Sequence, residues 1–330
     1  MLEVVHIAEL VQALKESERS SSAGTVARMM RCLESTGFLL VIDEAEETHT
    51  AFLNAAMELF RQPVAAKEQL LSTDRAKRGY SGYSTENFAS LAGRAGPNDA
   101  VEKFRIGPEL DPEELTAGAS RREAREVMRF YFPNQWTGVS SDLRDLCLLH
   151  YRRMEELTIT LLHVLERGLG IPEGFFADCM SLHTSIMTLN YYPPEELRSE
   201  LRMAAHTDVS LLTILVQTPS SHGLEILAPS SHAAESWIAV PHVPGSYVVN
   251  IGDCLQHWTQ GRLRSTFHRV VGSENGQAEE RLSVGFFAAP KYNALLKSPW
   301  DSTDPGLTYN RWRDRRIRDA MQSLKEFENK

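Results

Sequence analysis

Hydrophobic positions recur at helical spacing through the first sixty residues. Apolar side chains fall every three or four positions, which predicts amphipathic helices over 4–15, 22–35 and 50–61. Gly37 should end the second helix and Pro63 the third, because glycine commonly closes helices and proline cannot continue them. Between these two helices, the run FLLVI at 38–42 has the length of a buried strand.

The longest predicted helix covers residues 141–167. Its apolar residues form one stripe, and Gly168 stands where a C-terminal capping glycine belongs. Such a stripe predicts packing against a core rather than a cofactor site. A last helix is predicted over 309–327, with Trp312 and Ile317 on its apolar side.

The pattern changes to β-strands between about residues 185 and 289. Short apolar runs rich in branched and aromatic residues are separated by Pro-Pro, His-Gly, Pro-Gly and Asn-Gly pairs. Many short strands at regular spacing predict a sandwich or barrel. We therefore expect a single domain that is mainly β with flanking helices: a helical part over 1–100, a β core over about 100–290, and a C-terminal helix within 291–330.

The composition excludes several classes of protein. The 330 residues are 42% hydrophobic and 24% charged, which is typical of a globular protein. The net charge of -9 and the lack of a long basic run argue against nucleic-acid binding. No apolar run reaches the roughly 18 residues of a membrane span, and the N-terminus lacks signal-peptide features, so we expect a cytoplasmic location. The four cysteines form no C-x-x-C pair, which predicts reduced thiols rather than a zinc site.

His206, Asp208 and His268 are candidate metal ligands. The His-x-Asp spacing alone is not diagnostic, because 11 histidines and 44 acidic residues produce it by chance. In a strand, however, residues two apart face the same side, so an imidazole and a carboxylate can point at one place. His268 follows in the predicted strand STFHRVV, and two histidines with one carboxylate form the facial triad of non-haem Fe(II). A structural His/Asp pair with an unrelated core histidine is an equal alternative at this point.

Arg281 and Ser283 make a candidate anion site. They share a face of the next predicted strand, and a guanidinium beside a hydroxyl suits a carboxylate. An arginine inside a sheet is unfavourable unless an anion meets it, and the alternative is pairing with a structural acid. Asn190 and Tyr192 share a face in the strand before His206, where the phenol of Tyr192 can donate to the same carboxylate.

Segments along most of the chain resemble those of one enzyme family. NYYPP, HTDVSLLTILVQ, GDCLQHWTQGRLRSTFHRVV and ERLSVGFFAAP occur in this order between residues 185 and 290, with GFLLV, RGY and DAVEKFRIG upstream. This set resembles the isopenicillin N synthase-like branch of the 2-oxoglutarate/Fe(II)-dependent dioxygenases. A departure is Gln260-Gly261, where that family often has Asn-Gly. The resemblance implies a double-stranded β-helix (jelly roll) core, iron on the His-x-Asp and His residues, and the cosubstrate carboxylate on the Arg-x-Ser residues.

The resemblance also implies an oxidoreductase of metabolism, including secondary metabolism, that uses O2, Fe(II) and 2-oxoglutarate. We expect it to oxidise, by hydroxylation, a C–H bond of a small-molecule metabolite while 2-oxoglutarate is decarboxylated to succinate and CO2. Alternation from Arg281 puts Phe287 on the inward face as a candidate substrate contact. Tyr83 and Phe104 are further candidates, because the Gly- and Ser-rich region at 73–105 predicts a long loop. For each of the three, core packing is the alternative.

Other functions fit the same residues. A same-fold Fe(II) oxidase would use O2 without 2-oxoglutarate and hold the carboxylate of its own substrate on Arg281 and Ser283. A non-catalytic binding module would be marked by a missing ligand, and here the full set of three is present. The substrate, the choice among hydroxylation, desaturation and cyclisation, and the oligomeric state stay open.

Overall fold

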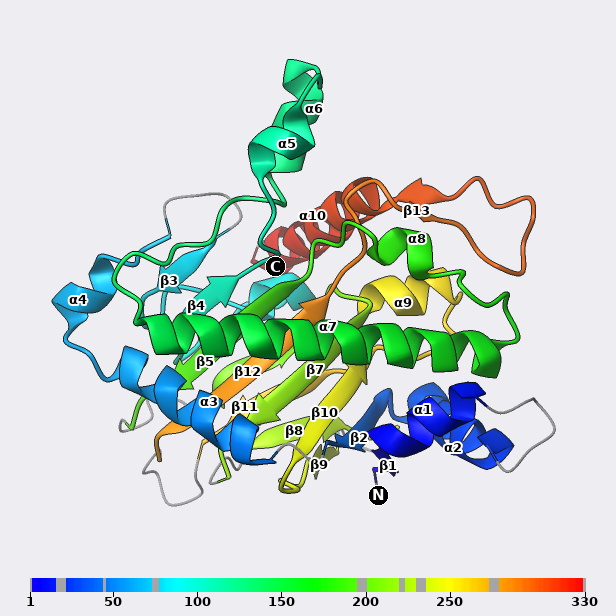
Figure 1. The fold of residues 1–330 in the computed structure, drawn as a ribbon, viewed down its shortest axis with the longest axis horizontal. Coiled ribbons are helices and arrows are strands. Elements are labelled where there is room, and N and C mark those ends of the chain that lie inside the picture. Colours follow the sequence, from blue (N-terminus) through cyan, green and yellow to red (C-terminus); the bar gives the residue numbers. More distant parts are fainter. Residues whose placement is uncertain are drawn as a thin grey trace.

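The structure is a computed structural model that describes residues 2–15, 22–43, 46–72, 77–194, 201–219, 223–229, 236–272 and 279–328. Its strands form an eight-stranded sheet, a four-stranded sheet and a two-stranded ribbon, and helices flank the sheets (Figure 1). The fold is therefore a mixed α/β arrangement of large sheets with flanking helices. No helix in the described part of the chain is long and apolar enough to cross a membrane.

The larger sheet has the strand order β1-β2-β10-β7-β12-β5-β4-β3. Neighbouring strands run antiparallel, except that β1 pairs with β2 in parallel. The bounds of these strands are β1 (Val4–His6), β2 (Phe38–Ile42), β3 (Gly79–Ser81), β4 (Glu102–Ile106), β5 (Ile186–Tyr192), β7 (Leu212–Gln217), β10 (Ser246–Ile251) and β12 (Arg281–Ala288).

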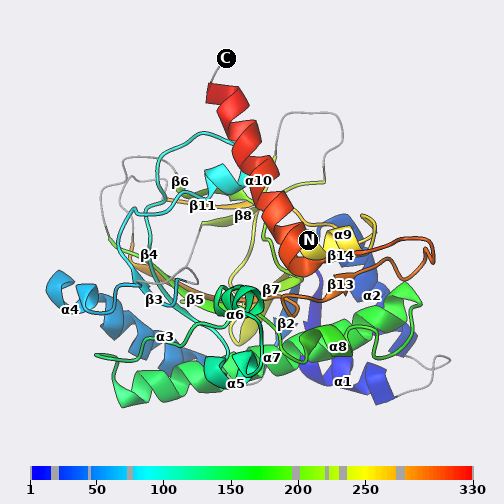
Figure 2. The same ribbon diagram turned by 90° about the horizontal axis from the view of Figure 1, so that it is seen from above.

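The smaller sheet lies over one face of the larger one (Figure 2). Its strand order is β6-β11-β8-β9, and its strands are β6 (Leu201–His206), β8 (Leu224–Leu227), β9 (Trp237–Ala239) and β11 (His268–Val271). A cavity of about 820 Å³ is lined by side chains from both sheets. The short ribbon of β13 (Leu295–Leu296) and β14 (Leu307–Thr308) leads into the last helix.

Helices cover the other face of the larger sheet. The long helix α7 (Ser141–Leu169) and α3 (Glu46–Phe60) pack across strands β5, β7 and β12, as Figure 1 shows. The helices α1 (Ile7–Lys15) and α2 (Ser22–Ser35) pack on α7, while α10 (Tyr309–Glu328) packs on the short 3-10 helix η1 (Ala89–Ala92). The remaining helices are α4 (Val64–Glu68), α5 (Pro112–Thr116), α6 (Arg121–Met128), α8 (Ala177–Met180) and α9 (Asp253–Trp258).

Alternation along β12 divides the core from the cavity. Leu282, Val284 and Phe286 are fully buried, and the ring of Phe286 packs 5.0 Å from Tyr151 of α7. The residues that alternate with them include Arg281, Ser283 and Phe287, and these three line the cavity on the opposite face of the strand. Successive side chains of a strand point to opposite faces of the sheet. The polar side chains of β12 therefore face the cavity between the two sheets.

The start of the chain differs from its helical prediction. Residues Val4–His6 form strand β1 along β2, so the first helix begins only at Ile7. The two valines of this segment suit either a helix or a strand, and pairing with the buried strand β2 decides between them.

The end of the long helix differs from its prediction as well. It is capped by Gly170, whose φ of 66° is left-handed, rather than by Gly168. Gly168 lies inside the helix, where a Cβ atom would come 2.4 Å from the side chain of Met30 on α2. Close helix packing, rather than capping, therefore explains this glycine.

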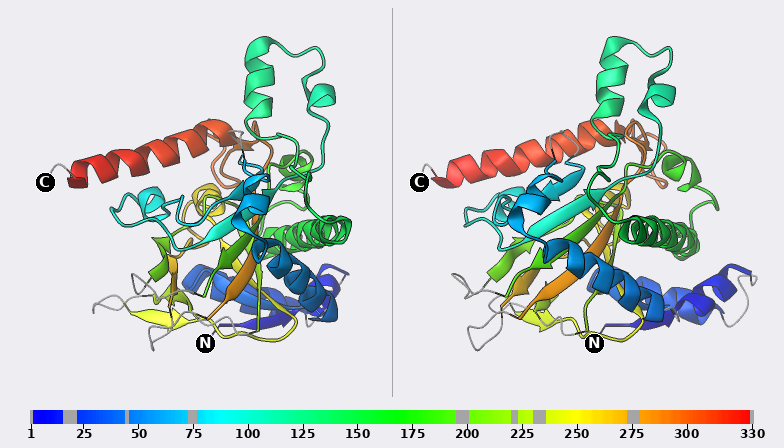
Figure 3. Two further views of the ribbon diagram at one scale, coloured as in Figure 1. Left: turned by 90° about the vertical axis from the view of Figure 1, so that its left-hand side faces the viewer. Right: turned by 60° about the vertical axis from the view of Figure 1, so that its left-hand side comes forward.

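Some elements are absent from the sequence-based prediction. The strand β6 contains Arg202 and two alanines, so it lacks the branched pattern of its neighbours. The helices α5 and α6 project from the body as a hairpin (Figure 3). The predicted loop at 73–105 holds strand β3, the helix η1 and most of strand β4 within its described residues. The four cysteines are buried and unpaired, as predicted.

Candidate active site

Three side chains meet at one end of the cavity. His206 is the last residue of β6, and His268 opens the neighbouring β11 directly opposite it. Asp208 follows β6 by two residues, so the turn after the strand, rather than alternation within it, presents this carboxylate. Its Oδ1 atom lies 3.8 Å from Nε2 of His206 and 3.7 Å from Nε2 of His268. Among the described residues, these three form the group of His, Cys, Asp and Glu that could hold one metal ion.

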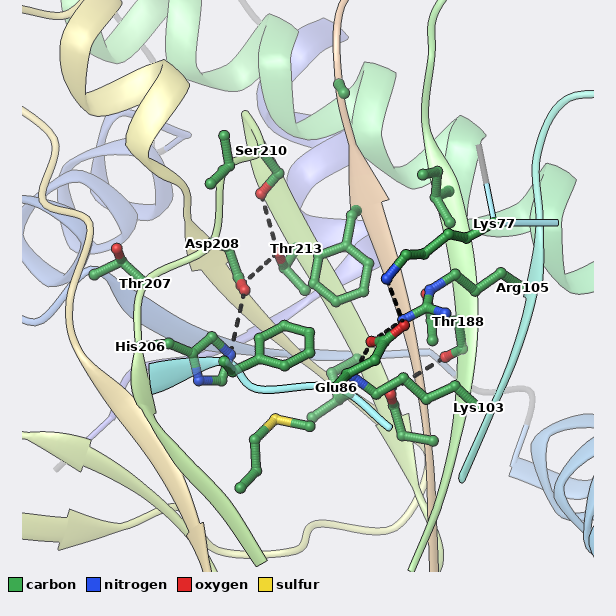
Figure 4. Close-up of a pocket in the computed structure, with 18 of the residues that line it drawn as sticks. Lys77, Glu86, Lys103, Arg105, Thr188, His206, Thr207, Asp208, Ser210 and Thr213 are labelled. Atoms are coloured by element: carbon green, nitrogen blue, oxygen red, sulfur yellow. Dashed lines mark hydrogen bonds and ion pairs between the residues drawn. The ribbon is translucent and has the colours of Figure 1, made fainter. Parts of the chain in front are cut away.

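The second oxygen of Asp208 is fixed by two neighbouring strands. Oδ2 accepts a hydrogen bond of 2.7 Å from Thr213 Oγ1 on β7 and one of 2.8 Å from Asn250 Nδ2 on β10. Figure 4 shows Asp208 turned between Thr213 and His206. Both bonds use Oδ2, so Oδ1 is left facing the two imidazoles.

The two histidines are also oriented by hydrogen bonds to the protein. Nδ1 of His206 lies 2.8 Å from the carbonyl oxygen of Ala204, and Nδ1 of His268 lies 3.2 Å from that of Thr266. A carbonyl only accepts, so each Nδ1 donates and each Nε2 keeps its lone pair. Metal-binding histidines are commonly held in this way by an acceptor on the second nitrogen. The three inward atoms thus make a donor set of two imidazole nitrogens and one carboxylate oxygen, which fits a divalent cation.

Burial supports these protonation states. Burial, followed by the neighbouring His268, lowers the pKa of the His206 imidazole, so this ring is neutral near pH 7. Burial alone would raise the pKa of the Asp208 carboxyl, but the two imidazoles and its two hydrogen bonds lower it overall. The carboxylate is therefore ionised and buried with no Lys or Arg partner among the residues that the structure describes, which is unfavourable unless a metal ion compensates it.

Arg281 lies on the floor of the cavity with neutral partners. The side chain is 2% exposed and donates to Ser283 Oγ and to Gln217 Oε1, each at 3.0 Å. Its guanidinium carbon lies 4.8 Å from the ring centre of Tyr192, and its Nε has no hydrogen-bond partner in the described part of the protein. No carboxylate of the described residues forms an ion pair with it. Burial lowers the pKa of this guanidinium, which shows that the site lacks compensating negative charge.

The predicted partners of Arg281 lie around it. Ser283 is two residues along β12, and Tyr192 pairs with Arg281 across the sheet. Asn190 pairs with Ser283 in the next row, and both Asn190 and Tyr192 line the cavity. Their donors and the orphaned Nε together form a cradle that fits a carboxylate. Gln217 was not predicted as part of it, because a glutamine on a neighbouring strand carries no motif in the sequence.

Two of the three predicted substrate contacts need correction. Phe287 lines the cavity, but the described lining includes neither Phe104 nor Tyr83. Phe104 is fully buried on the other face of β4, where its ring packs near Trp136. Tyr83 is 40% exposed, outside the cavity wall. Both predictions rested on membership of a loop region without knowledge of which face each residue occupies.

The neighbours of Phe104 line the cavity instead. Lys103 and Arg105 alternate with it along β4, and both reach the cavity wall together with Glu86. Sequence reasoning missed them, since charged residues normally mark a solvent-exposed face. The alternation rule would have found them once β4 was recognised as a strand, because Phe104 and these two cannot share a face.

Comparison with known proteins agrees with the geometry. Residues 183–290 match the model of the 2OG-Fe(II) oxygenase superfamily, and residues 3–138 match the model described as non-haem dioxygenase in morphine synthesis N-terminal. A 2-oxoglutarate-dependent dioxygenase of Aspergillus niger, caaD, is 32% identical over 256 residues, covering 73% of this chain and 70% of the relative. Gibberellin 20 oxidase 2 of Oryza sativa is 28% identical over 298 residues, covering 89% and 70%.

Solved structures show the same fold. A Neurospora crassa protein crystallised in complex with alpha-KG superposes with a TM-score of 0.78 at 20% identity, covering 96% of each chain. The rice dioxygenase for auxin oxidation superposes with a TM-score of 0.68 at 22% identity, covering 98% of each chain. These matches, the buried His/Asp/His group and the orphaned arginine lead to one conclusion: the chain belongs to the 2OG-Fe(II) oxygenase superfamily, whose members are non-haem Fe(II)- and 2-oxoglutarate-dependent dioxygenases.

Proposed function

We propose that this protein oxidises a C–H bond of a small-molecule metabolite, by hydroxylation, and that it converts 2-oxoglutarate to succinate and CO2 in the same cycle. His206, Asp208 and His268 would hold Fe(II). The observation that carries the proposal is the orientation of these residues. Each has one polar atom bound by the protein and one aimed at a common centre.

The proposal assigns the cosubstrate to the cradle around Arg281. The carboxylate of 2-oxoglutarate remote from its keto group would accept from Arg281 and Ser283, with Tyr192 and Asn190 beside it. Arg281 supports this role because it is buried with two neutral hydrogen-bond partners and an unpaired Nε. When bound, Fe(II) and 2-oxoglutarate supply the activation of O2 that side chains cannot perform.

The residues of the chain have three tasks in this reaction. The triad would hold Fe(II) through two imidazole nitrogens and one carboxylate oxygen, a donor set suited to a metal that also binds a cosubstrate and O2. Thr213 and Asn250 hold Asp208 as an ionised, single-oxygen ligand. The buried walls exclude water, so that the oxidation which the bound metal and cosubstrate would supply acts on the substrate rather than on solvent. Phe287, on the cavity floor, is proposed to contact the substrate.

The arrangement of the two larger sheets supports a double-stranded β-helix (jelly roll) core within a single domain. Both sheets contribute to one cavity, and iron ligands come from the smaller sheet while the cosubstrate cradle comes from the larger. We also propose a role in secondary metabolism, supported by relatives such as the Petromyces alliaceus proline hydroxylase buaE, which is 30% identical over 230 residues. A cytoplasmic location stays a prediction.

Iron content and succinate formation test this function together. His206→Ala, Asp208→Ala and His268→Ala should each lower bound iron and abolish succinate production from 2-oxoglutarate. His257→Ala is the matched control, because His257 lies on α9 beside Trp312 and outside the described cavity lining. Full succinate production by any triad variant would refute the assignment.

The same assay distinguishes the oxidase alternative from the proposed function. A same-fold oxidase would consume O2 without any keto acid, with its substrate carboxylate on Arg281. O2 consumption that needs 2-oxoglutarate, with one succinate formed per 2-oxoglutarate lost, excludes that alternative.

A further inference from the structure

A second charged cluster lines the cavity away from the iron ligands. Glu86 accepts from three cations: Lys77 at 3.0 Å, Lys103 at 3.2 Å and Arg105 at 2.5 Å. We call these four residues the β4 cluster, since Lys103 and Arg105 come from that strand. Figure 4 shows their charged ends gathered around Glu86 on the opposite side of the cavity from His206 and Asp208.

The β4 cluster has more positive than negative charge. Lys103 and Arg105 are buried, at 1% and 8% exposure, and Lys77 is more exposed. Glu86 is the carboxylate that these cations share in the cavity wall. The nearby Asp99 lies outside the cavity lining and accepts from the backbone N–H groups of Phe88 and Ala204. With Asp99 counted, the two buried cations, Lys103 and Arg105, are matched by two carboxylates, and the excess charge is that of the exposed Lys77.

The cavity as a whole is also lined by more Lys and Arg side chains than carboxylates. Its described lining contains seven Lys or Arg side chains against two carboxylates, Glu86 and Asp208, in a chain whose net charge is -9. In the proposed function, Asp208 binds the metal and Arg281 binds 2-oxoglutarate. Of the others, Arg129 pairs with Asp314 and Glu126 outside the lining, whereas the three cations of the β4 cluster share a single carboxylate of the lining, Glu86. Lys103 and Arg105 are buried cations that share a single carboxylate of the cavity wall, Glu86, and this arrangement favours an anionic ligand on that wall.

The position of the cluster suits a substrate rather than the cosubstrate. Lys103 pairs with Asn190 across the sheet, and Asn190 pairs with Ser283, so two strand spacings separate Lys103 from the strand that carries Arg281 and Ser283. Phe88 connects the cluster to the metal site: its ring lies 3.6 Å from the Lys103 ammonium and 4.9 Å from the His206 ring. An anion held by Lys103 would therefore leave the rest of its molecule beside the triad.

We propose that the substrate of this enzyme is a carboxylic acid, whose carboxylate binds Lys103 and Arg105 of the β4 cluster while its remainder reaches the metal. This inference rests on the proposed function, because it takes Arg281 to be occupied by 2-oxoglutarate. Burial and the neighbouring Arg105 lower the pKa of Lys103 to about 7, as expected for an ammonium in a cavity short of negative charge. A bound carboxylate would supply that charge.

Fluorine NMR of ligand binding tests the substrate class. The wild-type protein would be loaded anaerobically with Fe(II) and 2-oxoglutarate and titrated with fluorobenzoate, fluorophenylacetate and fluorocinnamate, each beside its methyl ester. At least one acid should bind about tenfold or more tightly than its ester, the effect of one charge-assisted hydrogen bond. Lys103→Met and Arg105→Met should each remove most of that preference. Lys291→Met, which removes a cation paired with Asp178 outside the cavity lining, should leave it unchanged.

Several outcomes would overturn the inference. Equal binding of every acid and its ester, binding of none of the acids, or an unchanged preference in Lys103→Met would each do so. Glu86→Gln removes the carboxylate that competes for the three cations; because Glu86 also raises the pKa of Lys103, the comparison is made at pH 6, where acid affinity should hold or rise. A fall as large as that of Lys103→Met would show that the cluster only maintains the fold. The visible absorption band of the Fe(II)/2-oxoglutarate complex in the same samples separates the two proposals. Its absence contradicts the proposed function, whereas its presence without acid preference contradicts this inference alone.

Discussion

Replacing Arg281 with methionine should separate function from stability. The variant keeps an unbranched side chain of similar length but removes the guanidinium. In the protein without 2-oxoglutarate, this group is 2% exposed, lacks an acidic partner among the described residues and leaves Nε unbonded. We therefore expect Arg281→Met to lose cosubstrate binding without losing stability.

The magnitudes follow from the contacts of Arg281. Its hydrogen bonds to Ser283 and Gln217 have a charged donor and contribute about 1.5–3 kcal/mol each. Its approach to the Tyr192 ring adds on the order of 2 kcal/mol in a desolvated site. Desolvation of the ion costs several kcal/mol, which offsets both. The free energy of unfolding of the variant should thus equal that of the wild type or exceed it by up to about 2 kcal/mol.

The effect on 2-oxoglutarate should be large. A guanidinium that holds a carboxylate through two charge-assisted hydrogen bonds contributes about 3–6 kcal/mol. The dissociation constant of 2-oxoglutarate should rise by roughly 10²–10⁴-fold, while Fe(II) affinity stays unchanged. Calorimetric titration of 2-oxoglutarate and urea unfolding of the same preparation measure both quantities.

A matched control and a clear refutation are available. Arg269→Met removes an arginine of β11 that pairs with Glu225 at 2.7 Å and does not line the cavity. This variant should keep its 2-oxoglutarate affinity. If Arg281→Met bound 2-oxoglutarate as tightly as the wild type, or if it unfolded several kcal/mol more easily, Arg281 would be a structural residue and the cradle assignment would be wrong.

Three further predictions concern the metal, the ligands and the substrate. Thr213→Val and Asn250→Leu each remove one hydrogen bond to Asp208 Oδ2 and should weaken Fe(II) binding by about 10–100-fold in a metal titration; unchanged affinity would show that Asp208 needs no such support. Fe(II) at about 100 times its dissociation constant should stabilise the folded protein by about 2.7 kcal/mol, seen as a higher Tm that EDTA reverses, and an unaltered Tm would count against a metal site. Burial and Arg105 lower the pKa of Lys103 to about 7 against the opposing effect of Glu86 and Asp99, so Lys103 loses its proton above that pH. Acid binding should therefore weaken between about pH 6 and pH 9 in the wild type and vary less in Lys103→Met, and parallel profiles would refute this role of Lys103.

The inward face of β12 could be predicted from the sequence because its alternation is regular. Once Arg281 was taken to face the cavity, Ser283 and Phe287 followed from the two-residue period, and the structure places all three in the lining. The iron-ligand candidates were predicted from spacing and from the family resemblance, although Asp208 lies beyond the strand. A local sequence pattern is enough to predict which side chains face a cavity where the strand is long and its alternation is regular.

The β4 cluster could not be predicted in the same way. Lys103 and Arg105 are buried because both pair with Glu86. Glu86 precedes Lys103 by seventeen residues in the chain. Pairing between distant segments leaves no local signal, and a lysine beside a phenylalanine suggests an exposed strand. The strand β6 was missed for a related reason, since Arg202 is buried through bonds to the backbone oxygens of Pro193 and Glu279.

The central claim is that His206, Asp208 and His268 hold an Fe(II) that 2-oxoglutarate then binds. Anaerobic visible absorption spectroscopy tests it most directly, with Fe(II) and then 2-oxoglutarate added to the wild type and to Asp208→Ala. A weak charge-transfer band that appears only with both additions, and only in the wild type, is the predicted result. A wild-type protein that binds iron but shows no band with 2-oxoglutarate, or an Asp208→Ala variant with the same band, would contradict the account.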